Sequence, residues 1–173
     1  CLLGMACKEV MVSAPLLVLL YDRTFVSGSF RQAWHRHGRL HLALAATWIL
    51  LAVLVLGMGG QRGGTAGFGL GISSGSYALT QCAAIIHYLR LCFWPQPLVF
   101  DYGTATVTDL GQVLPQALLL AALLLGTVLA LRHRPVVGFL AAGFFLVLAP
   151  TSSFLPVATQ TMAEHRMYLP LAA

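Results

Sequence analysis

The chain has 173 residues, of which 58% are hydrophobic and only 9% are charged, and its mean hydropathy is +0.83. Soluble domains carry about 25% charged residues, so these few charges would not cover the surface of a water-soluble protein of this size. The net charge of +5 comes from basic residues placed between apolar runs. A nucleic-acid binder would instead cluster them on a polar surface with aromatic platforms. The composition predicts an all-α, polytopic transmembrane helix bundle and no nucleic-acid partner.

Four apolar runs are candidates for membrane-spanning helices, because a helix needs about 20 apolar residues to cross the hydrocarbon core. They cover residues 1–21, 40–58, 113–131 and 136–149. The fourth run is short for a span, and a further run begins near residue 168. Both ends of the chain fall in apolar runs, so we expect residues 1–173 to be part of a single transmembrane domain that is truncated at both ends.

Two segments between these runs, which we expect to be loops, concentrate the basic residues. Segment 22–39 carries four arginines and turn 132–135 carries two, and positive residues favour the cytoplasmic side. If both segments are cytoplasmic, an even number of spans separates them. Residues 77–94 then do not cross the membrane, and they form an interfacial or re-entrant helix on the outer side. The polar residues along that helix recur at helical spacing, as expected for an amphipathic helix.

The histidines and cysteines of the sequence do not form an obvious site. His35, His37 and His41 fall in or near the first basic segment, where we expect them to be solvated. None of the six histidines follows a metal-ligand spacing, and the four cysteines contain no CxxC pair. We expect free thiols, with a disulfide or a metal site as the alternative. The glycine-rich stretch 57–75 follows no strand, which favours a flexible outer loop over a nucleotide-binding loop.

Ionisable residues at depth in a membrane usually face a bundle interior or a cavity and mark a functional site. Lys8 and Glu9 fall in the first apolar run and are therefore candidates. The alternative is a span that starts later, which would leave both residues at the outer interface.

A second set of candidates lies near the end of the chain, directly before the run that begins near residue 168. It consists of Glu164, His165, Arg166 and Tyr168. Arginine suits phosphate recognition, and the glutamate could accept a sugar hydroxyl. The alternative is an ordinary polar loop with an interfacial tyrosine. Weaker candidates are Asp101 and Tyr102 in the segment after the interfacial helix, and His87 and Arg90 on that helix.

Three stretches in this order resemble a known family. They are KEVMVSAPLLVLLYDRTF (8–25), HYLRLCFWPQPLVFDYG (87–103) and APTSSFLPVATQTMAEHRMYLP (149–170). They are similar to the membrane region of bacterial relatives of the transmembrane and TPR-repeat O-mannosyltransferases, within the GT-C glycosyltransferase superfamily. That family has Glu-Arg-x-x-Tyr-Leu-Pro in the third stretch. Here His165 stands between the acidic and the basic residue.

The resemblance implies a bacterial inner-membrane enzyme with its active site at the outer face. The donor would be a polyprenyl-phosphate-linked sugar and the acceptor a hydroxyl of a protein or glycan. The family's catalytic acidic residue would lie upstream of Cys1, so we expect the chain alone to be inactive. The resemblance assures no cofactor, and a divalent metal is left open. The alternatives are a lipid or solute transporter or flippase, which would show repeated span pairs, and a membrane anchor for a TPR interaction domain.

Overall fold

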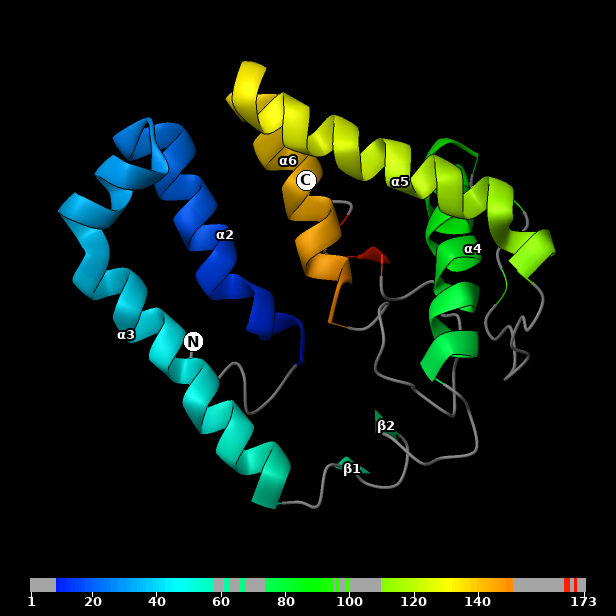
Figure 1. Ribbon diagram of the computed structural model, residues 1–173, viewed down its shortest axis with the longest axis horizontal. Coiled ribbons are helices and arrows are strands. Elements are labelled where there is room, and N and C mark those ends of the chain that lie inside the picture. Colours follow the sequence, from blue (N-terminus) through cyan, green and yellow to red (C-terminus); the bar gives the residue numbers. More distant parts are fainter. Residues whose placement is uncertain are drawn as a thin grey trace.

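The computed structural model describes residues 9–57, 61–62, 66–67, 74–94, 96, 99, 110–150, 167–168 and 170. Helices make up most of this part of the chain (Figure 1). In chain order the elements are η1 (Glu9–Ser13), α2 (Ala14–Tyr21), η2 (Asp22–Ser27), α3 (Phe30–Gly57), β1 (Gln61–Arg62), β2 (Ala66–Gly67), α4 (Ser74–Phe93), α5 (Leu110–His133) and α6 (Pro135–Leu148). The two short strands pair antiparallel. The predicted helical class is confirmed.

The first half of the described chain is a helical hairpin. A proline in the first turn of α2 starts that helix, which continues through the π-helical segment η2. The chain reverses at Gly28, whose φ of +75° is accessible to glycine without a steric penalty. α3 then packs back against α2 and η2. Trp48 Nε1 donates a hydrogen bond to the carbonyl oxygen of Val12 at 3.0 Å and ties the two arms together.

This hairpin corrects the expectation of a loop over residues 22–39. Helical structure runs to Ser27, only a two-residue bend follows, and α3 begins at Phe30. The backbone of α3 is non-helical at His37 (φ −123°, ψ 20°). This kink divides the helix into a basic first part and an apolar second part. The predicted span 40–58 corresponds to the second part.

α5 and α6 meet in a tight turn at Arg134. Pro135 opens α6 with the φ that a first helical turn requires. A Cβ atom added to Gly138 would collide with the backbone of Leu131 and Ala130. Glycine therefore allows the start of α6 to approach the end of α5 this closely. α6 has 14 residues, fewer than the roughly 20 that a span requires.

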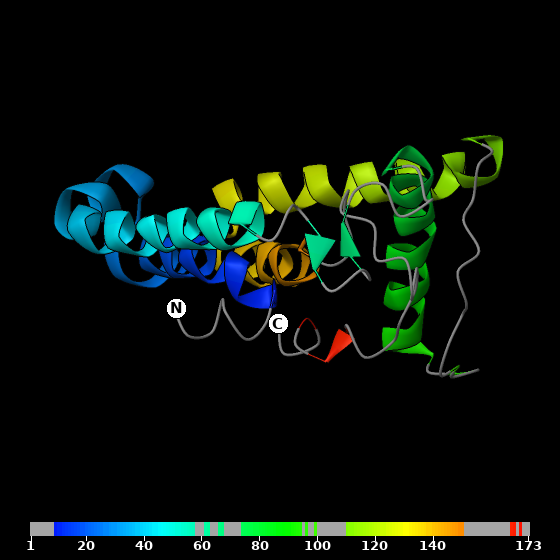
Figure 2. The same ribbon diagram turned by 90° about the horizontal axis from the view of Figure 1, so that it is seen from below.

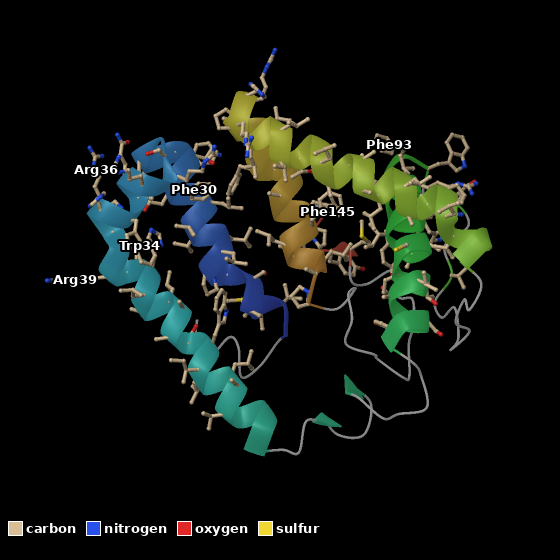
Figure 3. All side chains as sticks on the ribbon, in the orientation of Figure 1. Phe30, Trp34, Arg36, Arg39, Phe93 and Phe145 are labelled. Carbon is tan, nitrogen blue, oxygen red and sulfur yellow. The ribbon has the colours of Figure 1, made fainter. Side chains whose placement is uncertain are left out.

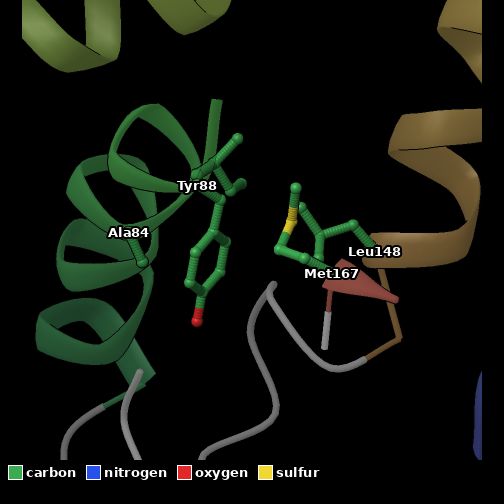
Figure 4. Close-up of a cluster of buried hydrophobic side chains, with 5 residues drawn as sticks. Ala84, Tyr88, Leu148 and Met167 are labelled. Atoms are coloured by element: carbon green, nitrogen blue, oxygen red, sulfur yellow. The ribbon is translucent and has the colours of Figure 1, made fainter. Parts of the chain in front are cut away.

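α5 lies across α4 and α6 instead of running parallel to them, in both views of the molecule (Figures 1 and 2). The main buried cluster lies between α4 and the C-terminal end of α6. Its members are Ala84, Ile85, Tyr88, Leu148 and Met167 (Figure 4). Met167 comes from the short described segment near the end of the chain, so this cluster joins two parts of the sequence that lie about eighty residues apart, counted from Tyr88.

Two helical stretches in the described residues are long and apolar enough to cross a membrane. They are Val10–Ser27, with a mean hydropathy of 1.4, and Val113–His133, with a mean hydropathy of 2.2. Only 11% of the second stretch is buried, and leucines project from most of its surface. An apolar surface of this kind favours contact with a membrane over contact with water. The first stretch extends past the predicted end at residue 21 and includes Asp22 and Arg23.

Candidate functional site

A buried carboxylate lies where the α2–α3 hairpin turns. Asp22 is 6% exposed, and its Oδ1 accepts a hydrogen bond from the hydroxyl of Ser27 at 2.7 Å. Its Oδ2 lies 3.0 Å from Nδ1 of His37 and 2.8 Å from Nε2 of His41. Three polar side chains therefore provide hydrogen-bond partners for one carboxylate, whose burial without partners would cost free energy.

The local sequence explains why these groups meet. Ser27 is five residues after Asp22, at the other end of the π-helical segment. The bend at Gly28 returns the chain so that α3 faces η2. His37 and His41 are four residues apart, which places both on one side of a helix.

The expectation that the three histidines are solvated is wrong for His41, which is 5% exposed. The His37 side chain is 41% exposed, and His35 is exposed as expected. Asp22 was not among the candidates from the sequence. The sequence did contain a signal, because an aspartate ends an apolar run and two histidines four residues apart follow it. The basic residues around these histidines indicated a solvated loop instead.

The contact with Asp22 sets the orientation of the His41 ring. A carboxylate only accepts hydrogen bonds, so Nε2 of His41 donates to Oδ2 of Asp22. Nδ1 of His41 is buried and has no hydrogen-bond partner among the described residues. His37 is half-exposed, so water can reach its ring.

The cluster around Asp22 joins η2 to α3 through hydrogen bonds. It is not arranged for nucleophilic catalysis, because Ser27 donates its hydroxyl to Asp22 and the histidines face the carboxylate. In the part of the chain that the structure describes, no group of three or more His, Cys, Asp or Glu side chains could hold a metal ion.

Arg23 joins this hairpin to the α5–α6 turn. Its guanidinium donates a hydrogen bond to the carbonyl oxygen of Leu131 and its Cζ lies 4.9 Å from the centroid of the Phe30 ring. The first basic segment and the basic turn at 132–135 therefore lie at the same end of the molecule.

The structure describes part of the predicted site. Six of the predicted residues lie outside the described residues, namely Lys8, Asp101, Tyr102, Glu164, His165 and Arg166, as does the side chain of Glu9 at the start of η1. Tyr168 is described and is 83% exposed.

Near the end of α4, His87 is half-buried and Arg90 is exposed. The buried cluster contains both Met167, the neighbour of Tyr168, and Tyr88, the neighbour of His87. The structure therefore brings the end of the third resembling stretch beside the start of the second.

An apolar cavity of about 390 Å³ adjoins this contact, between α4, α5 and α6. Ile85 and Leu148 belong both to its lining and to the buried cluster. Other lining residues are Ala78, Gln81, Cys82, Leu120, Leu124 and Phe145.

Cys82 and Cys92 are free thiols, as expected. Burial raises the pKa of both thiols, which favours the protonated, less reactive form. The Cys92 thiol also donates a hydrogen bond to the carbonyl oxygen of Tyr88 at 3.2 Å. Cys1 and Cys7 lie outside the described residues.

No family model, curated protein or solved structure matches the chain.

Proposed function

We propose that this chain is part of the membrane domain of a glycosyltransferase that transfers a sugar from a polyprenyl-phosphate-linked donor to an acceptor hydroxyl at the outer face of the membrane. The observation that supports it is that Met167 and Tyr88 belong to one buried cluster. The described residues near the end of the third resembling stretch are thus joined to α4. Two candidate sets from distant parts of the sequence would thus contribute to one site.

The orientation of α4 supports a site at the membrane surface. If α5 crosses the bilayer, a helix that lies across α5 runs closer to the membrane plane (Figure 2). α4 would then be the interfacial helix on the outer side. Its basic residue Arg90 is exposed, and a cation at this depth could meet the phosphate of a lipid-linked donor.

The cavity between α4, α5 and α6 would suit the lipid part of the donor. Its lining is mainly aliphatic and aromatic, with the amide of Gln81 and the thiol of Cys82 as polar groups. An apolar chain would gain free energy there in proportion to the surface that it buries. The phosphate at the head of the chain would extend toward the end of α4.

The chemistry assigns different roles to different parts of the protein. Sugar transfer breaks the bond between the sugar and the donor phosphate, and it forms a bond to the acceptor oxygen. Arg166 would stabilise the negative charge on the departing phosphate. A general base must also remove the acceptor proton.

Sugar transfer from a labelled polyprenyl-phosphate-linked donor by the full-length protein in membranes tests the proposal. We expect Arg166→Ala and Glu164→Gln to abolish most transfer at normal expression. Arg132→Gln is the charge-matched control, because Arg132 is exposed at the α5–α6 turn, away from α4, and should leave transfer unchanged. Donor movement across the membrane without transfer would instead identify a flippase. Absence of both, with an intact TPR-domain interaction, would identify an anchor.

A further inference from the structure

The first part of α3 carries exposed arginines. Arg31, Arg36 and Arg39 are exposed, and none has a hydrogen-bond or ion-pair partner among the described residues. Arg36 and Arg39 point away from the rest of the molecule (Figure 3). Charged side chains held in this way are available to an anionic partner.

No described acidic side chain neutralises this surface. The sequence has five acidic residues, and Asp22 is the one whose side chain the structure describes. Asp22 is buried and faces Ser27 and the two histidines. Among the described side chains, the arginines of α3 therefore face no acidic counterpart.

Aromatic side chains lie among these arginines. Phe30 and Trp34 are 48% and 52% exposed, and they are four residues apart on α3. Together with Arg31, His35 and Leu19 of α2 they line a surface hollow of about 390 Å³. Aromatic rings and arginine stems beside an apolar residue are typical of the interface between headgroups and acyl chains.

The position of this surface fits that interface. It lies directly before the apolar second part of α3, where Leu42, Ile49, Leu50 and Val53 are exposed. It also lies beside Val10–Ser27, one of the two stretches that are able to cross a membrane. A bilayer that covers these apolar residues would bring its headgroups to the level of Trp34 and the arginines.

We propose that this surface binds the headgroups of anionic phospholipids. Arg31 and His35 would contact a lipid phosphate at the hollow, and Phe30 and Trp34 would lie beside the glycerol and the upper acyl chain. Arg36 and Arg39 would attract further anionic headgroups, each basic residue near the surface contributing about 1 kcal/mol. This inference depends on membrane insertion and not on the proposed sugar transfer.

Quenching of Trp34 fluorescence by brominated lipids tests this inference in the reconstituted chain. Two vesicle preparations contain the same mixture of phosphatidylglycerol and phosphatidylcholine, with the bromine on one lipid or on the other. The Trp34→Phe variant supplies the background from Trp48 and Trp94. With about 1 kcal/mol per arginine, we expect brominated phosphatidylglycerol to quench Trp34 at least about twofold more than brominated phosphatidylcholine.

Two triple variants test whether the lipid preference depends on the positive charge of the arginines and not on folding. Replacing Arg31, Arg36 and Arg39 together by glutamine should remove the preference, and replacing them by lysine should retain most of it. Equal quenching by the two lipids, or no quenching by either, would overturn the proposal. A preference that inorganic phosphate removes, and that sodium chloride of equal ionic strength does not, would also overturn it, because the site would then be one for free phosphate.

Discussion

Nε2 of His41 lies 2.8 Å from Oδ2 of Asp22, although the two residues are 19 positions apart and belong to different helical segments. This contact holds the two arms of the α2–α3 hairpin together at their turn. A buried carboxylate is stable there only while its acceptor oxygens have donors.

The His41→Ala variant should therefore be less stable. It leaves Asp22 with one donor fewer and opens a space in the hairpin, at a cost of about 1–3 kcal/mol. His35→Ala is the matched control, because His35 is exposed, and its effect should stay within about 0.5 kcal/mol. Chemical denaturation of the purified protein in detergent, followed by circular dichroism, measures both. Equal stability of the two variants would show that the Asp22–His41 contact does not stabilise the hairpin.

Gly28 should resist substitution because of its backbone conformation. Its φ is +75°, while the Cβ of an alanine would meet nothing closer than the side-chain oxygen of Gln32 at 3.8 Å. The cost of Gly28→Ala should thus be conformational, at about 1–2 kcal/mol. Gly38 has no atom within 4 Å of an added Cβ, so Gly38→Ala should be neutral or stabilise the helix by up to about 1 kcal/mol. A higher denaturation midpoint for Gly28→Ala than for Gly38→Ala would contradict the left-handed conformation at Gly28.

Gly138→Ala should disrupt the packing of α6 against α5 through a steric clash, and not through backbone conformation as at Gly28. The added methyl group would collide with the backbone of Leu131 and Ala130, which cannot rotate away as a side chain would. We expect destabilisation of at least about 1–3 kcal/mol, as for overpacked cores. Gly126→Ala, which meets no atom within 4 Å, provides the control within α5. Equal free energies of unfolding for Gly138→Ala and Gly126→Ala would rule out a close approach of α5 and α6 at Gly138.

The helical class and the positions of most helices were predictable from the sequence, because apolar runs and prolines mark them locally. α4 covers all but the last residue of the predicted helix 77–94, and α5 covers the predicted run 113–131. The boundary between α2 and α3 was not predictable in the same way. Basic residues in segment 22–39 indicated a loop, and the tertiary contacts of Asp22 instead allow helical structure to continue to Ser27.

The candidate site was predicted only in part, for a related reason. Sequence patterns identify residue types that bind phosphate, such as Arg90, but they do not show which distant segments meet. Met167 and Tyr88 share one buried cluster although about eighty residues separate them in the sequence. The role of Asp22 was missed because its partners come from the following helix, and a single aspartate beside arginines resembles an ordinary surface charge.

The hydrogen bond from Arg23 to Leu131 predicts a topology. Cysteines introduced at Gln32 and at Arg132, both exposed positions, should react with a membrane-impermeant thiol reagent from the same side of the membrane. The four native cysteines would first be replaced by serine. By the positive-inside rule that side is the cytoplasm. Reaction of the two positions from opposite sides would be incompatible with the Arg23–Leu131 contact in the membrane.

The cavity between α4, α5 and α6 gives a prediction about the donor lipid. Ala78 lines this cavity, whereas Ala83 on the same helix does not. The Ala78→Leu side chain would occupy part of the space and displace about two methylene groups of a bound chain, at about 0.8 kcal/mol each. In the full-length protein, the KM for a long-chain donor should therefore rise roughly tenfold. A short-chain donor analogue, which does not reach the cavity, should show an unchanged KM, and Ala83→Leu should affect neither donor. A similar rise for both donors would mean that Ala78→Leu perturbs the fold, and no rise for either would exclude the cavity as the place where the donor lipid binds.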